Sequence, residues 1–217
     1  MTTEVEFKII MLGVGGVGKC FQNHIEAEKG KFVKNEYSAD YDPTIEDQFK
    51  KKHHIPELST AATLIILDTA GQAELANSQD YSKYVSADAF VIVFSVVSSQ
   101  SLLEGEEILL KLVKEFGFKE ILCQKKTLVL CANKCDIPES NHQVKSRDIK
   151  SLAEKYDTKL IYQASAKNNI AIQGMFDDIC RDILKKRAFA ASESTSTTTT
   201  ATSTARANNG KCSCVIL

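Results

Sequence analysis

The stretch Val5-Glu6-Phe7-Lys8-Ile9-Ile10-Met11-Leu12, followed by Gly13-Val14-Gly15-Gly16-Val17-Gly18-Lys19, decides the fold of this chain. The first part is an apolar run of strand length, and the second is a glycine-rich segment that opens a predicted helix. Glycines permit tight turns that bring backbone N–H groups against phosphate oxygens, and a helix N-terminus attracts anions. Lys19 adds a positive charge for the outer phosphates. The segment predicts a phosphate-binding loop, and a simple glycine-rich turn is the alternative for the segment alone.

The rest of the chain alternates apolar runs of strand length with stretches of helical periodicity. Buried strands are predicted at Thr63–Leu67, Ala89–Val97, Thr127–Cys131 and, from a weaker run, Leu160–Gln163. Two covering helices are predicted from the stripes Ile108, Leu109, Leu112, Val113, Phe116 and Ile172, Met175, Phe176, Ile179, Ile183. This alternation predicts an α/β fold with a mixed, mostly parallel sheet and helices on both faces. A polar edge strand is expected at Gln48–Lys52.

The composition limits the number of domains and the kinds of partner. With 217 residues, 43% of them hydrophobic, the chain can fill one core, and a second sizeable domain is not expected. Lys and Arg number 27 against 28 Asp and Glu, so no overall field attracts a nucleic acid. The seven Cys lack the regular spacing of a secreted disulfide framework, which predicts a reducing cytosol. No apolar run approaches the roughly 20 residues that span a bilayer, so membrane attachment is expected only through an added lipid.

A second polar motif, Asp68-Thr69-Ala70-Gly71-Gln72, follows the apolar run Thr63–Leu67. Open α/β sheets bind ligands at the carboxyl ends of their strands, so Asp68 is expected in the site, where it can orient a water bound to Mg²⁺. A helix cap is the alternative role for this carboxylate. The unhindered N–H of Gly71 and the amide of Gln72 can together hold a phosphate and an attacking water.

A third motif, Asn133-Lys134-Cys135-Asp136, comes after the run Thr127–Cys131 and suits guanine. The Asp136 carboxylate can accept hydrogen bonds from N1–H and from the exocyclic amine, a pattern that adenine cannot supply. An unpaired carboxylate against adenine would cost several kcal/mol, so guanine is preferred. Asn133 is expected to donate to the ring N7, and the stem of Lys134 is expected to lie along the base.

A fourth motif, Ser165-Ala166-Lys167, follows the weak strand Leu160–Gln163. The N–H of Ala166 is expected to donate to the guanine O6. Each short motif occurs by chance in unrelated loops, but four of them in this order, each after a strand, predict a guanine-nucleotide site.

On these motifs the sequence resembles the Ras family of small GTPases, over roughly Glu6 to Arg187 and in the last four residues. The most specific element is Tyr41-Asp42-Pro43-Thr44-Ile45-Glu46-Asp47, which looks like the family's first switch and effector loop, and Gln48 and Phe49 extend that effector region. The resemblance implies a P-loop NTPase small G domain with a six-stranded sheet and five helices, GTP and GDP as ligands, and Mg²⁺ as cofactor. It also implies three kinds of partner: a guanine-nucleotide exchange factor, a GTPase-activating protein, and effectors with Ras-binding-type domains.

The resemblance also implies roles for single residues. Thr44 would reach both the metal and the terminal phosphate of GTP, and Lys19, Gly71 and Gln72 would form the catalytic group. Gly15 matches a position where a side chain would obstruct Gln72 and an arginine from an activating protein. Phe32 would stack on the base, although the segment from Cys20 to Tyr41 is longer than usual. The nucleotide-binding set is then Gly13, Val14, Gly15, Gly16, Val17, Gly18, Lys19, Cys20, Phe32, Tyr41, Thr44, Asp68, Thr69, Ala70, Gly71, Gln72, Asn133, Lys134, Asp136, Ser165, Ala166 and Lys167.

The sequence departs from the family's pattern at Cys20, where Ser or Thr is usual. A hydroxyl is a hard ligand that suits Mg²⁺, whereas a neutral thiol is soft and larger. Magnesium is therefore expected to bind less tightly, nucleotide to leave faster and the GTP-ordered state to be less favoured. The alternative is that the thiol packs in place of the hydroxyl and water completes the coordination. Gln72-Ala73-Glu74 also departs from the usual acidic pair, which affects recognition by exchange factors.

The C-terminal segment predicts a tether and a lipid anchor. Apolar periodicity stops near Ala188, and Ser192–Arg206 is a run of Ser, Thr and Ala interrupted by little else, which cannot form a core. The domains are therefore expected at 1–187 for the GTPase domain, 188–211 for a disordered tether and 212–217 for the lipidation signal. Cys214-Val215-Ile216-Leu217 fits the prenylation pattern, and the terminal Leu favours geranylgeranyl. Because one prenyl chain usually needs a second signal, Cys212 is expected to be palmitoylated.

These features predict a membrane-anchored GTP hydrolase with a slow intrinsic rate that cycles between GDP and GTP to control effector binding at the cytoplasmic face of a membrane, the plasma membrane being preferred. The competing class is a guanine-nucleotide-binding scaffold that Cys20 has impaired. Gly15 and Gln72 favour the enzyme, and Cys20 favours the scaffold. An ATP-dependent kinase does not fit the carboxylate of Asp136, and no nucleic-acid partner is expected.

Overall fold

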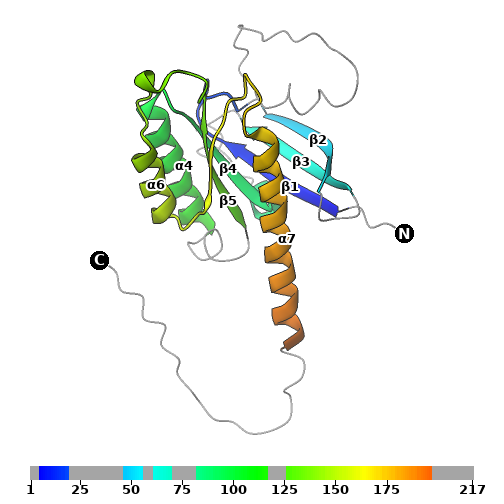
Figure 1. Ribbon diagram of the computed structural model, residues 1–217. Helices are drawn as coiled ribbons and strands as arrows, with labels where there is room; N and C mark the ends of the chain where they lie inside the picture. The colour runs from blue at the N-terminus through cyan, green and yellow to red at the C-terminus, as the bar shows by residue number, and fades with distance from the viewer. Residues whose placement is uncertain (1–4, 20–45, 56–60, 70–81, 117–125, 197–217) are drawn as a thin grey trace, which may run out of the picture.

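Six strands form one sheet in the order β2-β3-β1-β4-β5-β6 (Figure 1). The computed structural model describes residues 5–19, 46–55, 61–69, 82–116 and 126–196. The strands are β1 Val5–Leu12, β2 Glu46–His54, β3 Ala61–Thr69, β4 Ala89–Ser95, β5 Thr127–Asn133 and β6 Leu160–Gln163. All neighbours pair in parallel except β2 and β3, which pair antiparallel. The predicted six-stranded, mostly parallel sheet is confirmed, with β2 as an edge strand.

Side chains alternate between the two faces of the strands and build a core on each face. Every residue of β4 and of β5 is buried, as expected for central strands covered on both sides. Phe7 and Ile9 of β1 pack with the helix α7 (Ile172–Ser196), whereas Ile10 faces the other core.

The helices divide between these two faces (Figure 1). α4 (Ser99–Phe116) and α6 (Ser146–Lys155) cover one face, and α7 crosses the other. Two short elements, α3 (Ser82–Ser86) and the 3₁₀ turn η2 (Glu139–Asn141), complete the described helices. The predicted stripes are confirmed. On α4, Ile108, Leu109 and Leu112 are buried and Val113 packs at the margin of the core, while the side chain of Phe116 is outside the described part. On α7, all five predicted residues are buried.

Several elements are longer or shorter than their apolar runs. β3 continues to Thr69 and β5 to Asn133, so Asp68 and Asn133 lie inside strand ends rather than after them. β4 ends at Ser95 instead of Val97. Backbone pairing with a neighbouring strand decides where a strand ends, and hydrophobic periodicity does not report that pairing.

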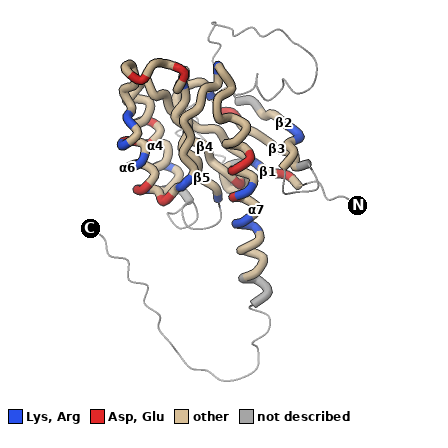
Figure 2. Tube along the Cα trace, viewed as in Figure 1, with Lys and Arg blue, Asp and Glu red and all other residues tan. Residues whose placement is uncertain are grey.

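α7 runs past the expected domain boundary at Arg187 and ends at Ser196. α7 thus overlaps the start of the expected tether at 188–211, because Ala is the best helix former and a helix can continue without an apolar stripe. α7 extends beyond the sheet in Figure 1, and Figure 2 shows charges of both signs along the part of α7 that lies against the sheet. Among the described residues, no helix combines the length and the apolar character needed to cross a bilayer.

Candidate functional site

The four motifs gather at one edge of the sheet because their strands run in parallel. β1 leads into Gly13, β3 ends with Asp68 and Thr69, β5 ends with Asn133, and β6 leads into Ala164 and Ser165. The carboxyl ends of parallel strands meet at the same edge, which is where such sheets bind ligands.

The phosphate loop packs so closely that glycine is needed at two places. Gly13 and Gly18 have φ of 151° and 83°. A Cβ on Gly13 would lie 2.2 Å from the Val93 carbonyl oxygen, and one on Gly18 would lie 2.4 Å from Asn133 Nδ2. The glycines therefore hold the loop against β4 and against the end of β5, while Gly15 and Gly16 are exposed.

Lys19 is bound within the loop that precedes it. Its Nζ donates to the carbonyl oxygens of Gly13 at 2.6 Å and Val14 at 3.0 Å, and the residue is only 8% exposed. The ammonium is thus held at the start of the loop instead of extending into solvent. This pre-organises a positive charge where backbone N–H groups would surround a phosphate.

Asn133 joins the phosphate loop to the loop after β6. Its Nδ2 donates to Val17 O at 2.8 Å and Gly18 O at 3.2 Å, and its Oδ1 accepts from Ala166 N at 3.0 Å. The residue is 1% exposed. The predicted hydrogen bonds from Asn133 and from the Ala166 N–H to guanine stay predictions. Each of these donors would then divide its hydrogen bonding between guanine and the protein atoms just named. Sequence reasoning missed this linking role, because no local signal reveals a partner so far along the chain.

Lys134 adds a second link to the phosphate loop. It adopts φ of 67°, in the left-handed region that is uncommon outside glycine, and its Nζ donates to Gly16 O at 2.7 Å. With its Nζ held at Gly16 in this way, the aliphatic part of the Lys134 side chain can still lie along a base, as predicted.

Ser165 orients the carboxylate of Asp136. The Ser165 hydroxyl donates to Asp136 Oδ1 at 2.6 Å and accepts from Asn168 N at 3.1 Å. Ser165 is fully buried, and its backbone pairs in both directions with Ile170 at 3.2 and 3.0 Å. Asp136 is therefore held in one orientation before any base is present, while Lys167 nearby is exposed.

The two cysteines around this motif are neutral at pH 7. Burial, and then the neighbouring Cys135, raises the pKa of Cys131 to about 12. Burial and then Asp136 also raise the pKa of Cys135 above its ordinary value, and its N–H donates to Ala164 O at 3.0 Å. A neutral thiol is a poor nucleophile, so neither cysteine is arranged for covalent chemistry.

At the carboxyl end of β3, Asp68 is 2% exposed and Thr69 is fully buried. Thr69 Oγ1 donates to Met11 O at 3.1 Å, and Asp68 is in register with Met11. This places the carboxylate beside the end of the strand that leads into the phosphate loop.

The other predicted site residues lie outside the described part of the chain. These are Cys20, Phe32, Tyr41, Asp42, Pro43, Thr44, Ile45, Ala70, Gly71, Gln72, Cys212 and Cys214. Of the predicted effector region, Glu46 to Phe49 form the first half of β2, where Glu46 pairs with Thr69 and Asp47 with Asp68. The first half of β2 is thus paired with the end of β3 that carries Asp68 and Thr69.

Comparison with known proteins finds relatives over most of the chain. The family model described as the Ras family matches residues 8–185. Ras-like protein 2 of Mucor circinelloides f. lusitanicus is 32% identical over 182 residues, which cover 84% of this chain and 84% of that protein. The GTP-binding protein Rit2 of Mus musculus is 33% identical over 189 residues, covering 84% of this chain and 77% of that protein, and Rit2 of Rattus norvegicus has the same values.

Proposed function

The chain belongs to the Ras family of small GTPases, and on that premise we propose that it is a membrane-anchored switch whose GDP and GTP forms control effector binding. Membership in the family implies guanine-nucleotide binding, GTP hydrolysis and switch signalling. The proposal adds the residues that do this, the slow rate, the lipid anchor and the partners.

The observation that supports the proposal most is the joining of the two ends of the site. Asn133 bonds to the phosphate loop with one side-chain atom and to Ala166 with the other. One buried amide thus fixes the distance between the residues for the phosphates and those for the base. A ligand with a purine at one end and a phosphate chain at the other fits this arrangement, because both halves are positioned before it binds.

At the base end, Asp136 is the proposed reader of guanine. The hydroxyl of Ser165 holds Oδ1 of Asp136, so the carboxylate would meet the base without first having to rotate. N1–H and the exocyclic amine of guanine would both donate to it, whereas adenine would leave it unpaired.

At the phosphate end, Lys19 supplies charge, and Gly71 and Gln72 are the proposed phosphate and water ligands. Asp68, a buried carboxylate beside β1, is a hard oxygen donor of the kind that Mg²⁺ prefers, so this part of the donor set fits the ion. Thr44 directly and Asp68 through water would hold Mg²⁺, which when bound neutralises phosphate charge. Loss of the terminal phosphate would remove the contacts of Thr44 and Gly71, and this is the proposed switch.

The test is selective nucleotide uptake by the purified full chain. Titration calorimetry with GDP, GTP and ADP, each in magnesium, is expected to give binding for the guanine nucleotides only. Equal uptake of ADP, or no uptake of any nucleotide, would contradict the proposal.

The second candidate is a scaffold that binds guanine nucleotides but hydrolyses GTP poorly, and Cys20 favours it. A thiol next to Lys19 is expected to weaken the binding of Mg²⁺ and thereby to speed the release of GDP. Single-turnover hydrolysis with and without magnesium separates enzyme from scaffold. GDP release across a magnesium titration, in this chain and in Cys20→Ser, tests the thiol directly, and identical curves would contradict its effect.

The proposed anchor is a geranylgeranyl group on Cys214 together with a palmitoyl group on Cys212, which would place the switch at the cytoplasmic face of the plasma membrane. Exchange factors, activating proteins and effectors would meet it there. Loss of membrane residence in Cys214→Ser and partial loss in Cys212→Ser are expected in cell fractionation.

A further inference from the structure

Two consecutive carboxylates of α7 hold opposite edges of the sheet. Asp177 Oδ1 lies 2.7 Å from Nε2 of His53 on β2, and Asp178 Oδ2 accepts a short hydrogen bond from the hydroxyl of Tyr162 on β6. β2 and β6 are the first and last strands in the sheet order. α7 therefore ties together the full width of the sheet through residues that do not line the nucleotide site.

Of these two edge strands, β6 is the shorter and has fewer residues paired with its neighbouring strand. It has four residues, pairs with β5, and buries none of its side chains completely. Ala164 continues it with two in-plane bonds, from its N–H to Ala132 O at 2.9 Å and from Cys135 N to its carbonyl at 3.0 Å. Such bonds resist separation from β5 more than bending out of the sheet plane, and a side chain that stands perpendicular to the sheet opposes that bending.

The Tyr162 contact is well defined on the α7 side. Asp178 Oδ1 accepts from Arg181 at 2.8 Å, which leaves Oδ2 for the Tyr162 hydroxyl. The bond from Tyr162, and then Arg181, lower the pKa of Asp178, so the acceptor is ionised at pH 7. Burial, and then Asp178, raise the pKa of Tyr162, so the donor is neutral. A neutral hydroxyl donating to a carboxylate is among the stronger hydrogen bonds in proteins.

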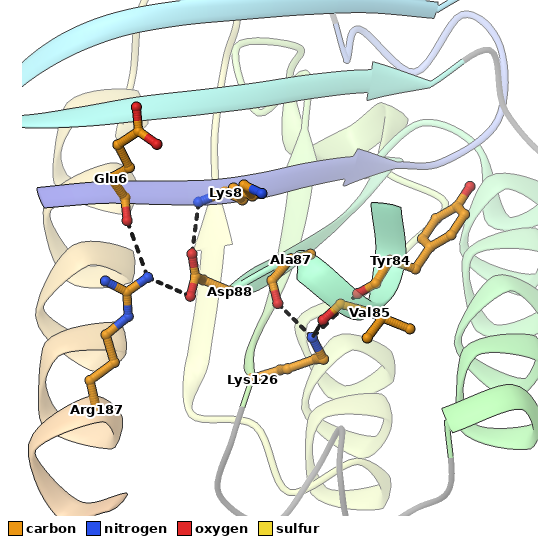
Figure 3. Close-up of polar contacts among 8 residues, drawn as sticks. All are labelled: Glu6, Lys8, Tyr84, Val85, Ala87, Asp88, Lys126 and Arg187. Atoms are coloured by element: carbon orange, nitrogen blue, oxygen red, sulfur yellow. Dashed lines mark hydrogen bonds and ion pairs between the residues drawn. The ribbon is translucent and has the colours of Figure 1, made fainter. Parts of the chain in front are cut away.

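α7 is a firm support for β6 because its other half is anchored as well (Figure 3). Arg187 donates to Glu6 O at 3.1 Å and to Asp88 Oδ1 at 2.7 Å, and the backbone N–H of Lys8 on β1 donates to Asp88 Oδ2 at 2.8 Å. A further contact joins Thr127 Oγ1 on β5 to Asp182 at 2.7 Å. Movement of α7 away from the sheet would break all of these contacts together.

We propose that Tyr162 and Asp178 are positioning residues for the guanine nucleotide, which hold β6 against α7 and thereby set how long the nucleotide stays bound. The strand leads within a few residues to Ser165, whose hydroxyl holds Asp136 at 2.6 Å, and to Ala166. Outward bending of β6 moves Ser165 away from Asp136 and frees the carboxylate to rotate. This inference rests on the proposed reading of guanine by Asp136.

The test is GDP dissociation from Tyr162→Phe, a change that removes one hydroxyl and keeps the ring. With GDP carrying a fluorescent N-methylanthraniloyl group, dissociation is expected to be about tenfold faster, the factor that corresponds to about 1.4 kcal/mol. Single-turnover hydrolysis of bound GTP is expected to stay within about twofold, because the phosphate loop is held by other bonds. Asp178→Ala should match Tyr162→Phe, and the double variant should be no faster than either one.

Two variants separate positioning from a general loss of packing. Tyr156→Phe is the matched control: Tyr156 is 1% exposed in the core on the other face, and its hydroxyl finds no hydrogen-bond partner among the described residues. It is expected to keep the GDP dissociation rate of the unaltered chain. Asp178→Asn keeps an acceptor for the Tyr162 hydroxyl. Its GDP dissociation is therefore expected to be nearly as slow as in the unaltered chain, and much slower than in Asp178→Ala.

The rates of GDP dissociation and of GTP hydrolysis decide whether Tyr162 positions the nucleotide site. An unchanged GDP dissociation rate in Tyr162→Phe overturns it, and so does an equal acceleration in Tyr156→Phe. A fall in hydrolysis as large as the rise in dissociation would show a general structural role and overturn it too. In those cases the unaltered chain still takes up GDP selectively, so the proposed function stands; if it takes up no guanine nucleotide, both fail.

Discussion

Replacing Asn133 with Asp tests the link between the two halves of the site. Nδ2 of Asn133 donates to Val17 O at 2.8 Å and Gly18 O at 3.2 Å, and Oδ1 accepts from Ala166 N at 3.0 Å. Asp has nearly the same shape and still accepts from Ala166. It cannot donate, so an oxygen would face two carbonyl oxygens at a position where the native side chain is only 1% exposed.

The expected loss of stability follows from these contacts. Two lost hydrogen bonds cost about 1 kcal/mol each, and two buried carbonyls left without a partner add to this. A buried carboxylate without a cation costs several kcal/mol more unless it takes up a proton. We expect Asn133→Asp to lower the free energy of unfolding by about 3–5 kcal/mol and to weaken GDP binding by at least about a hundredfold.

The assay is urea unfolding at pH 7 at several GDP concentrations, since bound ligand stabilises the folded state and must be separated from folding itself. Titration calorimetry gives the affinity for GDP. Asn141→Asp is the matched control, because Asn141 is exposed and the oxygen that accepts from Ser140 at 3.3 Å is retained. If Asn133→Asp stays within about 1 kcal/mol of the unaltered chain, near the usual range of surface substitutions, and binds GDP as tightly, the reasoning is refuted.

Three further predictions address single features. Gly18→Ala places a Cβ 2.4 Å from Asn133 Nδ2 at a φ of 83°, so GDP affinity measured by calorimetry is expected to fall at least about tenfold, and an unchanged affinity would contradict the close packing. Ala171→Gly relieves a φ of 60°, which is worth about 1–2 kcal/mol, but the more flexible unfolded chain costs about 0.5–1 kcal/mol. The free energy of unfolding in urea is therefore expected to rise by about 0.5–1 kcal/mol, and a fall would contradict this reasoning. The bond from Tyr162 lowers the folded-state pKa of Asp178, so this contribution to stability is present above the ordinary carboxyl pKa of about 4 and is lost as pH falls through the lower folded value. Melting temperatures from pH 6 to pH 2 should therefore fall more steeply in the unaltered chain than in Asp178→Asn, and parallel curves would argue against the contact.

The fold was largely readable from local patterns. Apolar runs of strand length predicted β1, β3, β4, β5 and β6, and helical stripes predicted the buried faces of α4 and α7, because burial on a strand or helix repeats with a fixed period along the chain. Strand ends were less well predicted: polar Asp68 and Asn133 still pair in the sheet, and pairing depends on the neighbouring strand. α7 overlaps the first residues of the expected tether, because the end of apolar periodicity is not the end of a helix.

The site divides in the same way. The residue types for phosphate and guanine, including Lys19, Asp136 and Ser165, are present in the sequence because their chemistry is local. Their partners are not: Asn133 bonds across to Val17, and Tyr162 on β6 meets Asp178 on α7. The sequence by itself determined the sheet's main strands, the order of the motifs and the kinds of group at the site. Only the tertiary structure decided which groups hold one another, because the strand order and the crossing of α7 bring together residues whose separation along the chain carries no periodic signal.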